Sequence, residues 1–292
     1  MNPAPAPTRA RKRRMLDWFI RLAVLVVLGW LFFRWFERAN VYQPTRTWWA
    51  TGAELGIPWE DVRFRTRDGI ELSAWFFPAA TNAPFRDLAI VVSHGNGGNI
   101  SHRLSLYRLL HEVGLNVLGY DYRGYGQSTG RPTEEGTYLD GEAALDWLRA
   151  RGFAETNLVV HGESLGGGIA AELALRRPSL RGLILQSTFT SVPDLGKEVF
   201  PILPVRTLGH IHYDTCAKLP SIRVPVLILH SREDTLVRFH HAERNFAAAN
   251  APKWLKEIRG DHNDQPDASP DLYAAAVREF LAASAVRSPS NP

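Results

Sequence analysis

The sequence predicts an α/β fold in which a mostly parallel, eight-stranded sheet is covered by helices on both faces. From about residue 60 onward, short apolar runs alternate with longer stretches of helical periodicity. The runs are apolar throughout, which is typical of strands buried on both faces. With 45% hydrophobic and 22% charged residues among 292, the composition is that of a folded globular protein.

A hairpin is predicted first, and single strands between helices follow it. Asp68-Gly69 marks a turn between two extended segments, residues 62–65 and 70–77. Six further strands are predicted at residues 88–93, 116–120, 157–161, 182–186, 224–230 and 254–258. Helices are predicted at residues 103–113, 134–151, 168–177, 239–249 and 271–283. Parallel sheets bind ligands at the carboxyl ends of their strands, so we expect a site in the turns after these strands.

An apolar segment near the N-terminus predicts a membrane anchor. Residues 15–36 contain an uninterrupted apolar run, residues 22–33, and tryptophans near both ends. As a helix, these 22 residues span roughly 33 Å, which is enough for a hydrocarbon core of about 30 Å. Arg21 and Arg34 can extend toward the two membrane surfaces, which keeps the cost of their charges modest.

Basic residues precede this segment and account for the charge of the whole chain. Five of them lie between Arg9 and Arg14 and exceed the net charge of +4, so the remainder carries −1 and no nucleic-acid partner is indicated. The positive-inside rule predicts a cytoplasmic N-terminus and a catalytic domain on the far side of the membrane, periplasmic or extracytoplasmic. A cleaved signal peptide and a helix lying flat on the membrane are the alternatives, although residues 34–39 lack the pair of small residues that marks cleavage.

The turn after the strand at 157–161 carries the pattern G-x-S-x-G at residues 162–166. A serine at the tip of a sharp strand-to-helix turn adopts a strained backbone, and glycines two residues before and after it remove Cβ atoms that would collide. Ser164 is therefore predicted to be a nucleophile. Because Ser164 stands at a helix N-terminus, the N–H of Leu165 is predicted to be a donor of the oxyanion hole.

This pattern, with the motifs around it, resembles the α/β-hydrolase family over about residues 60–284. More narrowly, the sequence is similar to the membrane-anchored serine hydrolases of the serine-aminopeptidase-like (S33-type) group. A further motif, His94-Gly95-Asn96-Gly97-Gly98, follows the strand at 88–93. The resemblance implies that the backbone N–H of Asn96 is the second oxyanion donor. Phosphate binding is the alternative for this glycine-rich turn, which however lacks the Lys-Ser/Thr ending of a P-loop.

In this fold the nucleophile is followed in the chain by an acid and then by a histidine base. Asp234 follows the strand at 224–230, at the position where the family carries its acid, and the neighbouring Glu233 is its rival. His262 follows the last predicted strand, in a loop that contains a glycine. The resemblance therefore implies a triad in which Asp234 orients His262, and His262 activates Ser164.

Other polar residues near the strand ends are predicted to be structural. The motif at residues 121–128 implies a turn tied by Asp121 and Arg123, and His94 and His161 stand at strand ends.

Neither a metal nor a cofactor is predicted. Among the ten histidines, a metal site would draw on His210, His212, His240 and His241, but these lack H-E-x-x-H or another ligand pattern. The single cysteine, Cys216, allows neither an internal disulfide nor a cysteine metal site.

The segment from 188 to 223 is too long for a simple connection between strands, and it is predicted to form a lid over the site. Its apolar residues indicate an acyl or other apolar group in the substrate, or serve only to pack the lid onto the body. They are Val192, Leu195, Val199, Phe200, Ile202, Leu203, Val205 and Leu208.

These observations predict a serine hydrolase that cleaves a carboxylic ester, thioester or related acyl bond in a small molecule or lipid. A serine peptidase or acyltransferase on the same triad is one alternative, and an inactive membrane-tethered binding protein is another. The predicted organisation is a basic tail, an anchor, a hydrolase domain with its lid at 188–223, and a disordered end. The corresponding residues are 1–14, 15–36, 41–286 and 287–292, with residues 1–8 also predicted to be disordered.

Overall fold

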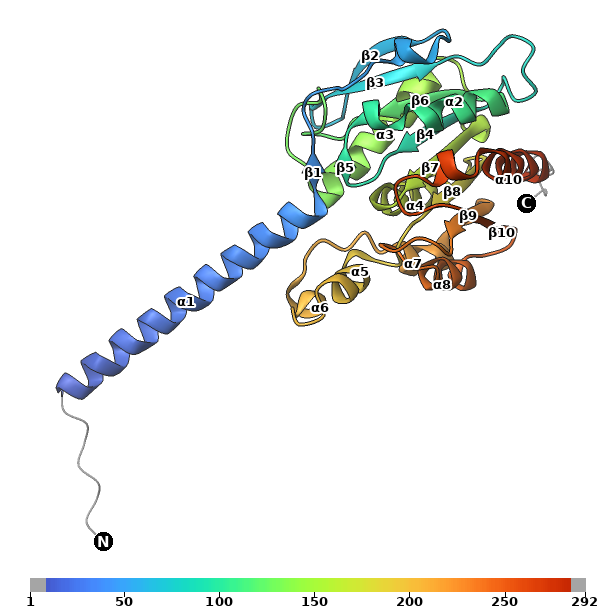
Figure 1. The fold of residues 1–292 in the computed structure, drawn as a ribbon. Coiled ribbons are helices and arrows are strands. Elements are labelled where there is room, and N and C mark those ends of the chain that lie inside the picture. The colour runs from blue at the N-terminus through green and yellow to red at the C-terminus, as the bar shows by residue number, and fades with distance from the viewer. Residues whose placement is uncertain (1–8, 285–292) are drawn as a thin grey trace, which may run out of the picture.

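The structure is a computed structural model of the chain and describes residues 9–284. The ends predicted to be disordered, residues 1–8 and 287–292, lie outside the described residues. Helix α1 (Arg9–Val41) projects from the domain as one long helix (Figure 1). It is long and apolar enough to cross a membrane, with a mean hydropathy of 2.0 in its most apolar part. It extends beyond residues 15–36 at both ends, where Arg, Lys, Ala and Glu favour helix.

Eight strands form one sheet at the centre of the domain: β2 (Glu60–Arg65), β3 (Glu71–Phe77), β4 (Ala89–Ser93), β6 (Asn116–Tyr120), β7 (Leu158–Glu163), β8 (Gly182–Gln186), β9 (Val226–Ser231) and β10 (Lys253–Ile258). Their order across the sheet is β10-β9-β8-β7-β4-β6-β3-β2. Only β3 is antiparallel to its neighbours, β2 and β6, and every other neighbouring pair in this sheet is parallel. The predicted fold class and its eight strands are confirmed.

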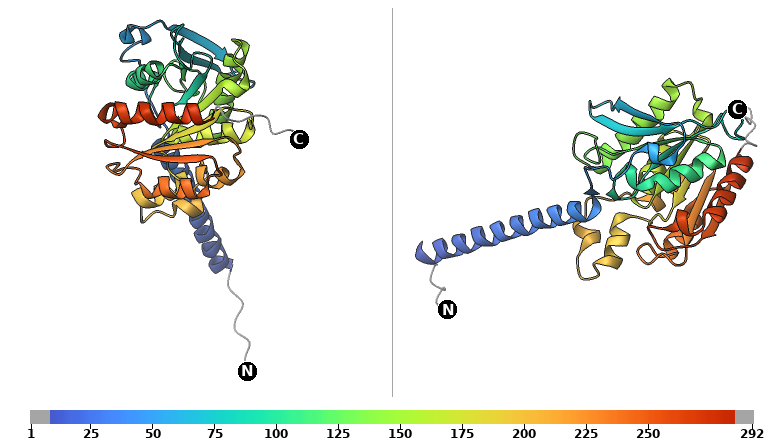
Figure 2. Two further views of the ribbon diagram at one scale, coloured as in Figure 1. Left: turned by 90° about the vertical axis from the view of Figure 1, so that its right-hand side faces the viewer. Right: turned by 45° about the horizontal axis from the view of Figure 1, so that its top comes forward.

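Helices cover both faces of this sheet, as predicted (Figure 2). Along β4, Val91 packs into a core shared with α3 (Glu134–Ala150) and α4 (Leu165–Arg176). Ile90 and Val92 pack into a core shared with α2 (Leu104–Val113) and α10 (Pro270–Ala283). Successive side chains of a strand point to opposite faces, so the sheet divides the core in two. The helices after α1 are α2 (Leu104–Val113), α3 (Glu134–Ala150), α4 (Leu165–Arg176), α5 (Val192–Val199), α6 (Val205–Leu208), α7 (Thr215–Lys218), α8 (His240–Ala248), α9 (Gln265–Ala268) and α10 (Pro270–Ala283).

The parallel strands bring their carboxyl ends to one edge of the sheet. The turns that carry Ser164, Asp234 and His262 follow β7, β9 and β10, and the glycine-rich turn after β4 lies at the same edge. The connection from β8 to β9 holds α5, α6 and α7 and spans the residues for which a lid is predicted. We refer to its residues 188–223 as the insert.

A second sheet of two very short strands joins the end of α1 to the domain. Strand β1 (Gln43–Pro44) pairs in parallel with β5 (Gly97–Gly98). The N–H of Gln43 donates to the carbonyl of Asn96 at 3.0 Å, and the side-chain amide of Asn96 donates to the carbonyl of Asn40 at 3.4 Å. The chain that leaves the helix is therefore hydrogen-bonded to the glycine-rich turn.

A buried ion pair fixes the turn after β6. Arg123 donates to Asp140 through Nε at 2.9 Å and through its backbone N–H at 2.8 Å, and its Nη1 donates to Asp68 at 2.8 Å. Asp121 connects the same turn to the segment before α2, because its carboxylate accepts the N–H of Ile100 at 2.8 Å. Burial raises the pKa of Asp140 to about 6 even with Arg123 beside it. The charged form of the Asp140 carboxyl group therefore depends on its ion pair with Arg123.

Replacing Arg123 with leucine is expected to lower the free energy of unfolding by about 3 kcal/mol, because it leaves the carboxylate of Asp140 buried and unpaired. Urea unfolding of the full chain in detergent micelles, followed by tryptophan fluorescence, measures the change. The matched control is Arg65→Leu, which breaks an exposed pair with Glu71 and is expected to cost less than about 1 kcal/mol. Equal costs for the two variants would contradict this assignment.

Candidate active site

The turn between β7 and α4 holds Ser164 in a strained backbone conformation. Its φ is 52° and its ψ is −113°, a region that residues with a side chain rarely occupy. A Cβ on Gly162 would lie 2.3 Å from the carbonyl oxygen of Gly166, and a Cβ on Gly166 would lie 2.0 Å from the carbonyl oxygen of Ser93. Both glycines of the G-x-S-x-G pattern are therefore required by the close approach of backbone to backbone.

The three side chains predicted to act together meet at this turn. His262 Nε2 lies 3.0 Å from Ser164 Oγ, and His262 Nδ1 lies 2.8 Å from Asp234 Oδ2. All three residues are at most 7% exposed. With the Nδ1 proton held by the carboxylate, Nε2 is left to accept the hydroxyl proton of the serine.

Donors on several sides orient the carboxylate of Asp234. Its Oδ1 accepts the backbone N–H groups of Leu236 (3.1 Å) and Val237 (2.8 Å). Its Oδ2 accepts the side-chain amide of Gln265 at 3.0 Å in addition to the imidazole of His262. These bonds leave the carboxylate little freedom to rotate away from the imidazole.

Glu233, the other candidate for the acid of the triad, has a different hydrogen-bond partner. Its Oε2 accepts the N–H of Gly260 at 3.0 Å, so Glu233 holds the loop that carries His262 rather than the imidazole itself. Gln265 was not foreseen from the sequence. It is held in turn by the hydroxyl of Ser187, which donates to Gln265 Oε1. A glutamine three residues after a histidine carries no recognisable signal, because its partners come from turns distant in the chain.

The two predicted oxyanion donors occupy rigid backbone. Leu165 is the first residue of α4, so its N–H has no acceptor within the helix. The peptide joining Gly95 to Asn96 is fixed because His94 Nδ1 lies 2.7 Å from the carbonyl oxygen of Gly95. In a trans peptide the N–H points opposite to the C=O, so the N–H of Asn96 faces away from this contact. The carbonyl of Asn96 is itself held by the hydroxyl of Tyr125 at 2.9 Å.

A buried ion pair next to the serine was also missed by the sequence analysis. Arg103 Nε donates to Glu163 Oε2 at 2.6 Å, and Arg103 Nη2 donates to the carbonyl of Gly97 at 3.4 Å. Burial opposes the charge on Glu163, but the charge and hydrogen bond of Arg103 outweigh it and lower the pKa of that carboxyl group. The pair links the serine turn to the glycine-rich turn. A polar cavity of about 80 Å³ adjoins it and includes His262 in its lining.

His161 helps to position Gln186, which is hydrogen-bonded to Ser164, and this is consistent with its predicted structural role. Its Nε2 lies 2.7 Å from the hydroxyl of Tyr273 and 3.2 Å from Gln186 Oε1. Gln186 in turn accepts the N–H of Ser164 through its backbone carbonyl at 2.9 Å. Burial lowers the pKa of His161 from 6.5 to about 4, so the ring is neutral near neutral pH.

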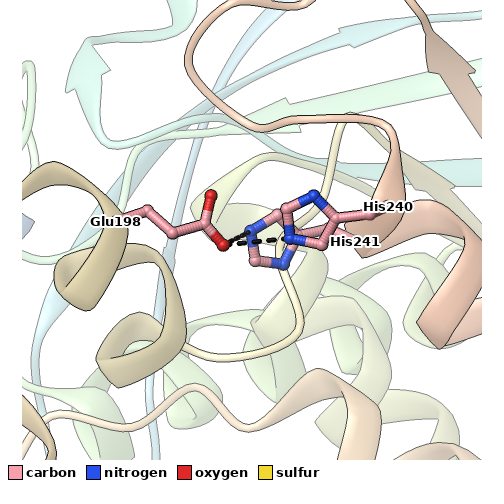
Figure 3. Close-up of side chains that lie close together, drawn as sticks. All are labelled: Glu198, His240 and His241. Carbon is pink, nitrogen blue, oxygen red and sulfur yellow. Dashed lines mark hydrogen bonds and ion pairs between the residues drawn. The ribbon is translucent and has the colours of Figure 1, made fainter.

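One group among the described residues is close enough to hold a metal ion. It consists of Glu198, His240 and His241, whose ligand atoms lie within 4.8 Å of one another (Figure 3). The N–H of Thr190 donates to His241 Nδ1 at 3.1 Å, so the proton of the neutral ring lies on Nε2, 3.2 Å from Glu198. That nitrogen therefore has no lone pair for a metal. We interpret the group as a polar contact between the insert and α8. His210, also considered from the sequence, pairs with Glu37 instead.

Comparison with known proteins finds a matching family, sequence relatives and solved structures. The family described as serine aminopeptidase, S33 matches residues 86–214, which include Ser164. An uncharacterized protein of Mycobacterium tuberculosis is 35% identical over 270 residues, covering 91% of this chain and 95% of that protein. Protein bem46 of Schizosaccharomyces pombe is 30% identical over 285 residues, covering 91% and 92%. A solved esterase of Pyrococcus furiosus shares the fold with a TM-score of 0.69 at 23% identity, covering 82% of this chain and 98% of that one.

The contribution of His161 to the stability of the protein is expected to fall as the pH is lowered from about 6.5 toward 4. In this interval the unfolded chain binds a proton at His161 that the folded chain does not bind, so the free energy of unfolding decreases by at most about 1.4 kcal/mol per pH unit. Burial also lowers the pKa of His241 to about 4, which acts with the same sign.

Urea unfolding at about pH 7 and about pH 5 measures this dependence. His161→Gln is expected to reduce the difference between the two conditions, whereas His212→Gln, at an exposed position, is expected to preserve it. An undiminished difference in His161→Gln would show that His161 does not titrate as described.

Proposed function

The chain belongs to the α/β hydrolases of the serine aminopeptidase-like (S33) family, and on that premise we propose that it is a serine hydrolase cleaving a carboxylic ester, thioester or related acyl bond. The observation that carries the proposal is the continuous contact from Ser164 Oγ through the imidazole of His262 to Asp234. A serine hydroxyl is a weak nucleophile until a positioned base takes its proton, and this arrangement supplies the base.

The proposed reaction begins when Ser164 Oγ bonds to the acyl carbon of the substrate. The hydroxyl proton passes to His262 Nε2, and the carbonyl electron pair moves onto the oxygen, where the N–H groups of Leu165 and Asn96 stabilise the negative charge. Collapse of this intermediate expels the alcohol or thiol, which takes the proton from His262. Water then attacks the acyl-serine with His262 again as base, releasing the carboxylic acid and restoring Ser164. Asp234 stabilises the imidazolium in both steps.

Ester or thioester cleavage is preferred to peptide cleavage for two reasons. The structural neighbour from Pyrococcus furiosus is named an esterase, and the insert carries exposed apolar side chains and contacts the end of α1. Peptide hydrolysis on the same triad is the second candidate, favoured by the aminopeptidase name of the matching family. An inactive binding protein would have no need to retain the strained serine and its base in contact.

We also propose that α1 is an uncleaved membrane anchor with its N-terminal end in the cytoplasm and the hydrolase domain on the far side, periplasmic or extracytoplasmic. The last turns of the helix are part of the domain: Phe33 is 8% and Glu37 is 9% exposed. Glu37 Oε1 accepts the backbone N–H groups of His210 and Ile211 at 2.9 and 3.1 Å. A segment bonded in this way to the insert is expected to stay with the mature protein.

Replacing Ser164 or His262 with alanine is expected to lower kcat on p-nitrophenyl esters by about 10⁴- to 10⁶-fold. The fluorophosphonate label on the wild-type protein is expected to disappear in Ser164→Ala and to remain in Ser221→Ala, which changes an exposed serine outside the proposed triad. An unchanged rate in His262→Ala would eliminate the proposed base.

Esters of graded acyl length, assayed beside peptide p-nitroanilides, separate the two candidate reactions. Faster turnover of the anilides would favour the peptidase.

Protease added to intact bacterial spheroplasts is expected to degrade the hydrolase domain, because the basic residues in the first turns of α1 hold the N-terminus in the cytoplasm. Immunoblotting against a C-terminal tag measures the loss, and a soluble cytoplasmic protein that stays intact serves as the control. A domain that is protected until the cells are lysed would reverse the proposed orientation.

A further inference from the structure

The insert carries an unusual concentration of exposed apolar side chains. Outside α1, six large hydrophobic residues are exposed in the described part of the chain, and three of them, Val199, Ile202 and Leu208, lie within the ten residues 199–208. Ile202 is 95% exposed, so its side chain contacts almost nothing in the protein. Apolar residues gathered in this way mark a surface that contacts another apolar phase. We refer to residues 199–208 as the apolar tip.

The apolar tip lies against the end of α1. The rings of Phe36 and Phe200 meet edge to face with their centroids 5.1 Å apart. Phe33 and Phe36 also line a small apolar cavity of about 50 Å³ together with Phe200 and Val205 of the insert. Figures 1 and 2 show α5 and α6 beside the last turns of α1 in every view.

This contact fixes the height of the apolar tip relative to a membrane. The apolar part of α1 ends at Phe36, so a bilayer that the helix crosses has its surface near this residue. Phe33 lies one helical turn deeper, about 4.5 Å along the axis. Residues of the insert that touch both rings therefore lie at the boundary between headgroups and acyl chains. This step rests on the anchor proposed above.

The basic side chains of the apolar tip and of the residues beside it are also consistent with a position at the membrane surface. Lys197 precedes the apolar tip and Arg206 lies within it. Both are exposed, and their cationic groups are of the kind that anionic headgroups attract. Arg206 is also paired with Asp194 at 2.7 Å. Apolar side chains between basic ones are the pattern of segments that lie in a membrane interface.

The root of the insert is packed on the nucleophile turn. Thr188, its first residue, donates to the carbonyl of Gly162 at 3.4 Å, and its side chain fills the space that a Cβ on Gly167 would need. The same insert thus reaches from the serine turn to the end of the anchor.

We propose that the apolar tip dips into the headgroup–acyl boundary of the membrane that α1 crosses, and that the substrate is a lipid acyl ester taken from that bilayer. The occupant of the apolar tip is the lipid phase itself. The proposal deepens the proposed hydrolase function and depends on it for the substrate, but the insertion of the apolar tip is measurable without any reaction.

The depth of the apolar tip is the first test. The full chain, with Cys216→Ser to remove the native thiol, receives Ile202→Cys and an environment-sensitive fluorophore. It is reconstituted in vesicles of phosphatidylcholine with phosphatidylglycerol that contain nitroxide lipids labelled high on the acyl chain. The matched control is Leu272→Cys on α10, where the native side chain is 50% exposed. Strong quenching at 202 and none at 272 is expected. Equal quenching at both positions overturns the proposal.

The second test concerns the substrate. Ile202→Asp is expected to lower hydrolysis of a long-chain ester embedded in vesicles by about tenfold, since the apolar side chain no longer enters the bilayer, and to leave hydrolysis of a short soluble ester unchanged. Leu272→Asp is expected to change neither rate. An unchanged rate on the embedded ester in Ile202→Asp overturns the proposed route of the substrate. Failure of the wild-type protein to cleave either ester instead refutes the hydrolase proposal, while the quenching result still decides the insertion.

Discussion

The positive φ of Ser164 is the constraint on which the rest of the site depends. A residue with a side chain in this conformation costs about 1–3 kcal/mol, so the surrounding structure must enforce it. Enforcement comes from the near contact of Gly162 and Gly166 with neighbouring backbone and from the hydrogen bond that Gln186 accepts from the serine N–H. The result is a hydroxyl held 3.0 Å from the imidazole that can take its proton.

The polar groups around the serine act as a set rather than one by one. Asp234 is held by backbone N–H groups and by Gln265, and Arg103 neutralises Glu163 where burial alone would oppose a charge. Each of these groups comes from a turn after a different strand or from a helix next to it. A parallel sheet makes this possible, because it gathers loops that are distant in sequence along one edge.

The sequence was sufficient for the fold and for the residues that share a local pattern. Alternation of apolar runs with helical periodicity predicted all eight strands of the main sheet, and G-x-S-x-G predicted the serine turn together with the steric need for its glycines. Asp234 was preferred to Glu233 by resemblance alone, and only coordinates show that Glu233 bonds to Gly260. Gln265, Arg103 and the end of α1 could not be predicted, because each acts through partners 31 or more residues away in the chain and none has a local signature.

The pairing of β1 with β5 connects the chain after α1 directly to the glycine-rich turn of the domain. Residues 40–45 carry the hydrogen bonds that reach Asn96 and Gly98, so the turn proposed to hold the oxyanion is fixed by the chain that follows α1. Cutting the polypeptide just after Thr45 would remove one strand of the small sheet and the hydrogen bonds that residues 40–45 make with the turn at Asn96. Separation of the domain from α1 by proteolysis is therefore expected to loosen the turn that carries Asn96.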